Sequence, residues 1–359
     1  MDQILNVVFC MMTGMAVLAM IASMIRWDDW WVRVFDFPRI QIIIFILLTL
    51  LLFPFTSLEP NYWNILLLAL VLFSFIYQIR KIYPYTLLAK KEVKPYLGED
   101  SANAISLLVS NVCTPNRHTE KLIALVNTYQ PHLLLTLETD QWWEDRLAVL
   151  EELYPYQVKI PLDNLYGMHL YSKYKLENTK VLYIVEKDIP SIHSEVILPS
   201  AERISIHCLH PEPPSPTESD TSTARDAELL IVGKNVAEEK LPVLVFGDLN
   251  DVAWSRTTRL FQKISGLLDP RKGRGFFNTF HAGYPLFRWP LDHIFHSQEF
   301  LLRSIKRLPS IESDHFPIYI HLQLCPGVRQ ENDEAELEEE EEEWTEEKIE
   351  KADANLLSL

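Results

Sequence analysis

The chain has 359 residues and a formal net charge of −16 at pH 7, which is unevenly distributed. The last 29 residues, from Glu331 onward, hold 14 acidic and two basic residues, whereas residues 1–100 hold eight of each. A domain that binds duplex nucleic acid through phosphate contacts alone usually carries a basic excess. The middle of the chain lacks that excess, so its composition argues against such a protein. The length suits one large domain with appendages.

The four cysteines are scattered and form no CxxC pair. A disulfide framework and a cysteine zinc site are therefore not expected, and the pattern is typical of a reducing compartment.

Three uncharged apolar stretches open the sequence, at about residues 5–25, 40–58 and 60–79. Each approaches the roughly 20 residues that a helix needs to cross the hydrocarbon core of a bilayer. None shows the polar face that a helix packed in a soluble core would have. A cleaved signal peptide is the alternative for the first stretch, but its MDQ start lacks a positive charge. The sequence therefore predicts a transmembrane region over residues 1–82.

The basic residues around these stretches predict the orientation of the chain. Basic residues occur in the first loop and after the third stretch: Arg26, Arg33, Arg39, Arg80, Lys81, Lys90, Lys91 and Lys94. With three spans, both groups fall on the same side, which is the cytoplasmic side by the positive-inside rule. We expect an integral protein of the inner or plasma membrane, with the rest of the chain in the cytoplasm.

Residues 83–100 are polar, contain two prolines and are predicted to be a linker. Short β-rich runs then alternate with amphipathic segments, which predicts an α/β domain over residues 101–325. Strands are expected at 105–110, 133–137, 168–172, 204–209, 243–246, 291–295 and 316–324. Helices are expected at 119–129, 141–153, 223–239 and 255–264.

Residues 326–359 form an acidic tail that includes the run EAELEEEEEEW. Blocks of like charge repel one another, so disorder is expected, and binding of a protein partner of unknown identity is the alternative.

Polar side chains recur where the apolar strands of the central domain end. They are Asn111, Glu138, His210, Asp248, Asn250, Asp292, Asp314 and His315. Open α/β sheets collect functional groups at strand ends. Each residue alone is weak evidence, because GDLN is more often an ordinary turn and a lone strand-end acid is often structural. Their combination indicates one site.

As an ordered set, these segments resemble the endonuclease/exonuclease/phosphatase family, which includes the DNase I-like enzymes. The matching segments are SNV, PHLLLTLE, YGMHLYSKYKL, HPEPP, VFGDLNDVAWS, GLLDP, WPLDHIF and SDHFPI. They span most of residues 101–324, and His132 departs from the pattern, since Asp often follows this proline in the family. The resemblance implies a four-layer αβ-sandwich that hydrolyses phosphoesters with Mg²⁺ or Mn²⁺.

The resemblance also implies roles for these side chains. Glu138, Asn111 and Asp314 would form the metal site, because Mg²⁺ prefers oxygen ligands. His315 would contact the scissile phosphate while Asp292 holds its ring. Three further catalytic residues are expected, namely Asp248, Asn250 and His210, with Asn111 and Asn250 also binding substrate. Whether Asp248 or His315 is the general base stays open.

Other polar residues in the domain have a structural explanation. His207 and His210 are three apart on a strand, so their side chains lie on opposite faces and predict no zinc pair. His293 is expected to be structural, and DLNDVAW lacks the pattern of an EF-hand. Two loops, at 211–216 and 271–279, are expected to face substrate. Solvated surface positions are expected for Arg271, Lys272, Arg274 and Arg288.

The expected function is hydrolysis of a phosphodiester or phosphomonoester at a membrane, with a lipid headgroup or nucleic acid as substrate. Tethering favours the headgroup, and a nuclease, phosphatase or phospholipase-type reaction fits the family fold. The alternative is an inactive membrane scaffold that binds partners through its acidic tail. A transporter is disfavoured because the three spans contain no charge.

Overall fold

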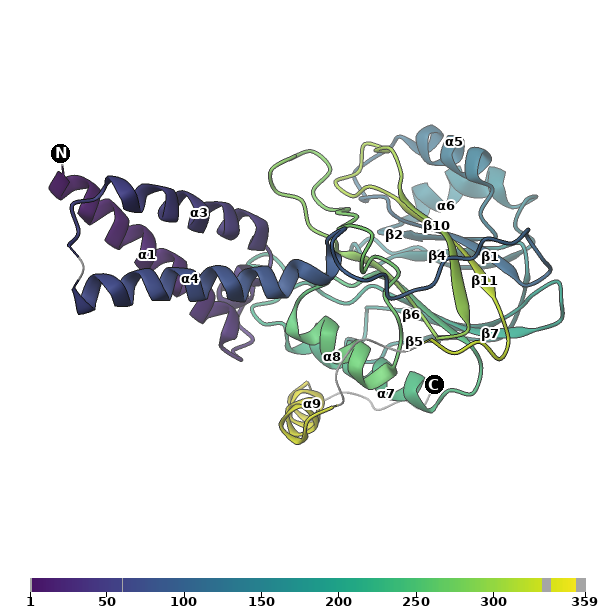
Figure 1. Ribbon diagram of the computed structural model, residues 1–359. Helices are drawn as coiled ribbons and strands as arrows, with labels where there is room; N and C mark the ends of the chain where they lie inside the picture. Colours follow the sequence, from purple (N-terminus) through teal and green to yellow (C-terminus); the bar gives the residue numbers. More distant parts are fainter. Residues whose placement is uncertain (1, 60, 331–336, 353–359) are drawn as a thin grey trace.

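The computed structural model describes residues 2–59, 61–330 and 337–352. Two β-sheets pack face to face, and helices cover the outer face of each (Figure 1). The six-stranded sheet has the order β10-β11-β1-β2-β4-β3, and the five-stranded sheet has the order β5-β6-β7-β8-β9. The first contains β1 (Ala104–Asn111), β2 (Leu133–Leu137), β3 (Tyr156–Ile160), β4 (Met168–Ser172), β10 (Phe300–Arg307) and β11 (Ile318–Leu324). The second contains β5 (Lys175–Leu182), β6 (Ser191–Ile197), β7 (Arg203–Leu209), β8 (Val243–Asp248) and β9 (Asp292–His296).

Three apolar layers hold this four-layer sandwich together. Between the sheets, side chains such as Leu107 and Leu135 pack against Ile206 and Phe246. On the outside of the six-stranded sheet lie α5 (Thr119–Tyr129), α6 (Gln141–Leu147) and the 3₁₀ turn η4 (Ala148–Leu150). On the outside of the five-stranded sheet lie α7 (Thr223–Glu238) and α8 (Arg256–Ser265). The predicted fold class is confirmed.

Four strands, β3, β5, β6 and β10, were not expected from the sequence. Three of them, β3, β5 and β10, are sheet edges, and five of the eight residues of β5 are exposed. An edge strand has one partner and is often wet on one face, so its residues show a weaker apolar signal.

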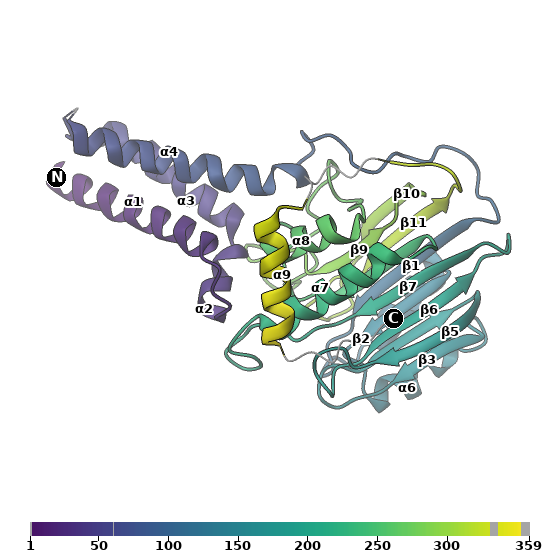
Figure 2. The same ribbon diagram turned by 90° about the horizontal axis from the view of Figure 1, so that it is seen from below.

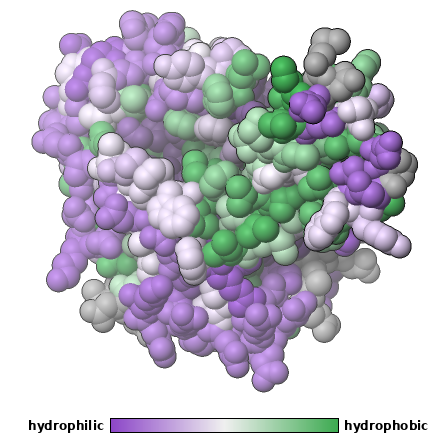
Figure 3. Space-filling view, turned by 90° about the vertical axis from the view of Figure 1, so that its left-hand side faces the viewer, coloured by the Kyte–Doolittle hydropathy of each residue, from purple (hydrophilic) through white to green (hydrophobic). Residues whose placement is uncertain are grey.

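The first part of the chain forms a bundle of three long helices that projects from the sandwich (Figure 1). It contains α1 (Asp2–Met24), α3 (Arg39–Leu52) and α4 (Tyr62–Ile82). Between them lie the short helix α2 (Trp30–Arg33) and the 3₁₀ turns η1 (Val34–Asp36) and η2 (Phe53–Phe55). Apolar side chains gather over the bundle, whereas the surface around it is mainly hydrophilic (Figure 3).

Two of these helices, at Gln3–Met24 and Tyr62–Tyr85, are long and apolar enough to cross a membrane. A third span exists only if Trp30–Asp36 and Arg39–Phe55, which are bent by 71°, count as one. The helix expected at 40–58 ends early because Pro54 follows α3 and leaves a 3₁₀ turn.

The bundle is joined to the sandwich through packed contacts. Tyr85, in the 3₁₀ turn η3 (Tyr83–Tyr85), is buried and donates a hydrogen bond to the Ala253 carbonyl over 2.7 Å. From the first loop, the Asp36 carbonyl accepts a hydrogen bond from the Trp254 indole over 2.7 Å. The segment 83–100, expected as a linker, is therefore partly packed against the domain.

The acidic tail contains a helix, α9 (Glu339–Lys351), where the sequence predicts disorder. In Figure 2 this helix lies alongside α7 and α8. Trp344 and Ile349 are buried in the apolar cluster beneath it, and Lys348 forms ion pairs with Asp28 and Asp226. The expectation of disorder is wrong for this segment, because its few apolar and basic residues recur at helical spacing. The rest of the predicted tail, at 331–336 and 353–359, lies outside the described residues.

Candidate active site

The strand order brings the predicted site residues to one end of the sandwich. β1 runs parallel to β2, and β7 runs parallel to β8, so Asn111, Glu138, His210 and Asp248 follow strands that end at the same edge. β9 and β11 run antiparallel to their neighbours and begin where those strands end. Asp248 and Asp292 are consequently direct cross-strand partners.

Asn111 joins the two sheets at this edge. Its side-chain amide donates to the Glu138 carboxylate over 2.7 Å and to the Asp248 carboxylate over 3.1 Å. Its side-chain oxygen, Oδ1, accepts a hydrogen bond from the Cys113 backbone N–H over 3.0 Å. Asn111 therefore positions Glu138 and Asp248 through its amide group, and its predicted role as a metal ligand stays a prediction.

His315 lies between two carboxylates. Its Nδ1 is 2.8 Å from Asp292 Oδ2, and its Nε2 is 3.4 Å from Asp248 Oδ2. Burial would lower the pKa of His315, but Asp248 and Asp292 outweigh it and raise the pKa to about 10. The imidazole is therefore held as the cation at neutral pH.

Residues around His315 fix its ring. The Ser313 hydroxyl accepts a hydrogen bond from the His315 backbone N–H over 3.0 Å. It donates one to the Asn111 backbone carbonyl over 2.8 Å. The Phe280 ring lies with its centroid 4.9 Å from that of His315. Sequence reasoning missed Phe280 and Ser313, although Ser313 stands inside the quoted SDHFPI segment.

Glu138 has the environment expected of a metal ligand. Its carboxylate receives the Asn111 amide and the more distant Thr114 N–H at 3.4 Å, while burial raises its pKa to about 7. Burial, Asp314 and Glu138 also raise the pKa of the neighbouring Cys113 thiol to about 12. Burial is the main cause of both shifts, and the neighbouring carboxylates add to it.

A cavity of about 330 Å³ opens over these groups, with Glu138, Asp248, Asp314 and His315 in its wall. Of the described residues lining it, four are carboxylates and none is lysine or arginine. Carboxylate oxygens are the ligands that Mg²⁺ and Mn²⁺ prefer. Glu138 and Asp314 therefore fit a hard divalent cation.

A second group of potential ligand atoms, on Asp248, Asp292 and His315, lies within 4.8 Å of one another. Both ring nitrogens of His315 face carboxylate oxygens. A ring that is protonated on both nitrogens has no lone pair for a metal ion. We therefore interpret this group as a proton-sharing cluster, and the expectation that Glu138 and Asp314 hold the metal stays a prediction.

Asp248 and Asn250 occupy the turn after β8. Asp248 accepts the Asn250 N–H over 3.0 Å, and burial raises the pKa of its carboxyl. The Asn250 side chain donates to the Pro211 carbonyl over 3.0 Å, which ties this turn to the loop after β7. Gly247 is required beside them, since its φ is +148° and an added Cβ would lie 1.9 Å from the Leu209 carbonyl oxygen.

His210 is buried at the end of β7, and burial lowers its pKa to about 4. It is neutral at pH 7, and its Nδ1 has no hydrogen-bond partner among the described residues. The Tyr166 ring lies 5.3 Å from it, centroid to centroid, and the Tyr166 hydroxyl donates to Glu218. A neutral ring with an unsatisfied nitrogen can accept or donate one hydrogen bond to a substrate.

The remaining predictions divide between the cavity and the core. The loop at 211–216 lines the cavity through Pro213, Pro214 and Ser215. His207 faces away and pairs with His193 over 2.8 Å, and His293 contacts the Asp251 carbonyl over 2.8 Å.

Two of the four basic residues expected at the solvated surface are buried. Arg271 forms an ion pair with Asp269 over 2.7 Å, and Lys272 forms one with Glu92 over 2.9 Å. The expectation of solvation is wrong for both. Glu92 and Lys272 are 180 positions apart along the chain, so no local sequence pattern predicted their ion pair.

One residue of the cavity wall comes from the N-terminal bundle. Phe37 lies in the loop between α2 and α3, lines the cavity and packs against Trp289 with ring centroids 5.7 Å apart. No sequence pattern predicted this contact, because the bundle and the site are far apart along the chain.

Comparison with known proteins agrees with the geometry. Residues 108–315 match the model of the endonuclease/exonuclease/phosphatase family. No curated protein sequence matches the chain.

Solved structures show the same fold at low identity. The human Nocturnin catalytic domain with bound sulfate is 17% identical, with a TM-score of 0.51, and the match covers 63% of this chain and 97% of that one. D. rerio TDP2 complexed with a single-strand DNA product is 15% identical, with a TM-score of 0.51, covering 62% and 100%.

Proposed function

Because the chain belongs to the endonuclease/exonuclease/phosphatase family, we propose that it is a metal-dependent phosphoesterase that acts at a membrane surface. The family assignment makes the chain a hydrolase of phosphoester bonds. The observation that carries the metal dependence is the cavity wall, in which four carboxylates occur without lysine or arginine. The cationic His315 in this wall is already paired with Asp248 and Asp292, so the remaining carboxylates would repel an anionic phosphoester unless a divalent cation were bound.

Glu138 and Asp314 would hold that cation, which neutralises phosphate oxygens when bound. His315, kept protonated by Asp248 and Asp292, donates a charge-assisted hydrogen bond to the phosphoryl group as negative charge develops. Asp248 is the group best placed to take a proton from water, because its burial raises its proton affinity. The structure thus favours Asp248 over His315 as the general base.

Asn250 and His210 would complete the phosphate site. Both line the cavity, and both carry side-chain groups that can donate a hydrogen bond. His210 is neutral at pH 7, so it can donate a hydrogen bond to the leaving oxygen without supplying the proton.

Membrane insertion is supported by the apolar surface of the bundle. Side chains such as Leu18, Leu51 and Ile65 are more than half exposed on α1, α3 and α4. Exposed apolar surface of this extent normally contacts lipid or protein. One end of the bundle packs against the sandwich, and Phe37 of that end lines the active-site cavity. The active site would therefore lie close to the membrane boundary.

The orientation proposal also has support. Arg33 and Arg39 are paired with Asp36, but Arg80, Lys81, Lys90 and Lys91 still give the sandwich end of the bundle a basic excess. This excess favours the cytoplasmic side for the catalytic domain.

A loop beside the site presents apolar side chains toward the bundle. Tyr284, Leu286 and Phe287 are exposed, and the Leu286 carbonyl accepts a hydrogen bond from Gln41 of α3 over 2.6 Å. Since α3 belongs to the apolar bundle, the loop tip lies at the level where the membrane would begin. We propose that this loop enters the lipid surface and that the substrate is a phosphorylated lipid headgroup.

The test uses the full chain in vesicles and compares two substrates, a phospholipid in the bilayer and soluble bis-p-nitrophenyl phosphate. Leu286→Gln with Phe287→Gln removes the apolar tip, and Val149→Gln changes an equally exposed apolar residue on the outer layer. The loop variant should lose roughly tenfold on the lipid and little on the soluble ester. Val149→Gln should change neither.

Equal losses on both substrates would contradict membrane contact by the loop. Activity on single-stranded DNA in place of the lipid would make the protein a nuclease. Hydrolysis of no substrate by folded protein would favour the inactive scaffold.

A further inference from the structure

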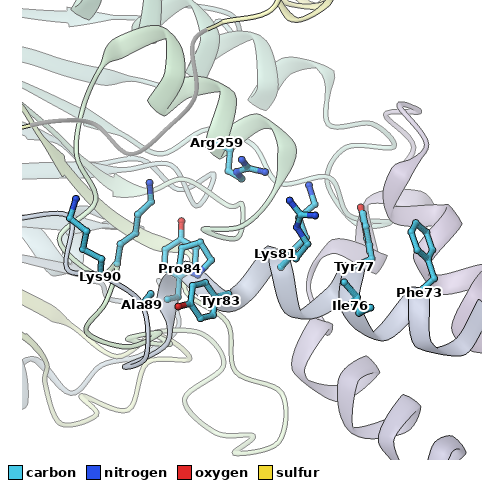
Figure 4. A pocket seen from close by; sticks show the side chains of 12 residues that line it. Phe73, Ile76, Tyr77, Lys81, Tyr83, Pro84, Ala89, Lys90 and Arg259 are labelled. Carbon is cyan, nitrogen blue, oxygen red and sulfur yellow. The ribbon is translucent and has the colours of Figure 1, made fainter.

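A second cavity, separate from the active site, lies where α4 leaves the bundle and meets the sandwich (Figure 4). It has a volume of about 650 Å³ and shares no lining residue with the active-site cavity. One face of α4 forms much of its wall, through Phe73, Ile76, Tyr77, Arg80 and Lys81. Their spacing places them along a single stripe of the helix.

This cavity is apolar at one end and basic at the other. Phe73 and Ile76 lie on α4 within the apolar bundle, and both are more than half exposed. Arg80 and Lys81 follow one turn later, and Arg259 of α8 faces them from the sandwich (Figure 4). The polarity therefore changes along α4 at the depth where a bilayer changes from hydrocarbon to headgroups.

The charge of the lining is of one sign. Five of its twelve described residues are basic, namely Arg80, Lys81, Lys90, Arg259 and Lys272, and none is acidic. Lys272 is neutralised by Glu92. Among the described residues, Arg80 and Lys81 form no salt bridge, and Lys81 contacts the Tyr77 ring at 5.6 Å.

A smaller adjoining cavity extends the positive charge. Lys81 and Arg259 line both, and the second adds Arg26, Arg256 and Lys263 together with the acid Glu341. Arg26 pairs with Glu340 and Lys263 pairs with Glu341, so the positive charge that this cavity adds comes chiefly from Arg256.

We propose that this cavity binds the phosphate of an anionic phospholipid from the leaflet that faces the catalytic domain. The phosphate would lie among Arg80, Lys81 and Arg259, and an acyl chain would run along Phe73 and Ile76. A soluble phosphate would use the basic end and leave the apolar end empty, so the continuous apolar wall favours a lipid. The site differs from the active site, because it offers no carboxylate for a metal and no general base.

Such a lipid would connect the bundle to the sandwich. Arg80 and Lys81 belong to α4, whereas Arg259 belongs to α8, which packs against α7. At the start of α7, Arg225 donates to the Asn250 carbonyl over 2.8 Å. Helices α7 and α8 therefore connect the lipid site to Asn250, which lines the active-site cavity.

The inference rests on the proposed membrane insertion, and the test separates the two. The purified full chain in detergent micelles is mixed with phosphatidylglycerol or phosphatidylcholine, and bound lipid is measured by native mass spectrometry. Wild-type protein should prefer phosphatidylglycerol, and millimolar inorganic phosphate should not displace it. Arg80→Gln with Lys81→Gln should weaken this binding roughly 30-fold.

Two controls distinguish loss of charge from loss of fold. Arg80→Lys with Lys81→Arg keeps both charges and should keep the preference. Lys240→Gln removes one exposed charge beyond the far end of α7 and should leave lipid binding unchanged.

The lipid site would be refuted by equal binding of the two lipids, or by an unchanged preference in the Gln variant. Displacement by inorganic phosphate would make it a site for a soluble anion. If alkaline carbonate released the chain from cell membranes, the membrane proposal itself would fail. Retention in the membrane without a headgroup preference would refute the lipid site alone.

Discussion

Asp292 Oδ2 lies 2.8 Å from Nδ1 of His315, while the other oxygen of the Asp292 carboxylate, Oδ1, has no hydrogen-bond partner among the described residues. Asp292 therefore directs its charge to one ring. On the opposite side of that ring, Asp248 lies 3.4 Å from Nε2. This arrangement keeps His315 cationic and aims it into the cavity that Glu138 also faces.

Asp292→Asn tests this arrangement, since it keeps the shape but removes one charge. The pKa of His315 should fall from about 10, because Asp292 is among the groups that raise it. We expect kcat to fall about 100-fold and KM to change little. The pH above which activity declines should also move down. An unchanged pH profile would show that Asp292 does not set the protonation of His315.

A second prediction concerns Glu228, which is buried in α7 with one carboxylate oxygen unpaired among the described residues. Burial raises its pKa to about 8 from an ordinary 4.5. Between these values the unfolded chain releases a proton that the folded protein retains, so stability falls as pH rises through this window. Glu228→Gln should therefore stabilise the protein at pH 8, on the order of 3 kcal/mol, and hardly at pH 4.5.

Thermal unfolding in detergent at the two pH values measures this difference. Glu202→Gln changes an exposed carboxylate and serves as the control. The same effect of Glu228→Gln at both pH values would mean that Glu228 is ionised throughout.

A third prediction concerns the ion pairs of α9. Lys348 is buried and pairs with Asp226 over 3.2 Å and with Asp28, whereas Lys351 pairs with Asp28 over 3.3 Å from an exposed position. Lys348→Met leaves buried carboxylates without their cation and should cost about 3 kcal/mol of unfolding free energy. Lys351→Met should cost less than about 1 kcal/mol.

Unfolding by heat or denaturant compares the two variants in the same buffer. Equal losses of unfolding free energy in the two variants would show that Lys348 does not hold α9 on the domain. They would support the disorder that the composition of the tail predicts.

The sequence predicted most of the sandwich, because its buried strands are apolar and end in polar side chains. Asn111, Glu138, Asp248 and His315 were all selected by that pattern. The limits of the domains remain predictions, as do the roles of the site residues, since geometry alone tests neither. What the geometry adds is their mutual arrangement, above all the bridge from Asn111 to both Glu138 and Asp248.

Long-range contacts were beyond sequence reasoning. Phe37 reaches the active-site cavity from the bundle, and Lys272 is enclosed by Glu92, yet each has an ordinary local sequence. The helix α9 was missed for a different reason. The density of glutamates predicted self-repulsion, but Lys348 and Trp344 supply contacts that anchor the helix to the domain.

The central claim is tested most directly by hydrolysis of bis-p-nitrophenyl phosphate by the full chain in detergent, with Mg²⁺ or Mn²⁺ and with EDTA. Glu138→Gln and His315→Ala are assayed beside wild type, with Glu202→Gln as a control. We expect metal-dependent activity that EDTA abolishes, a loss of at least about 100-fold in each site variant, and no loss in the control. Activity that persists in EDTA, or in either site variant, would contradict it.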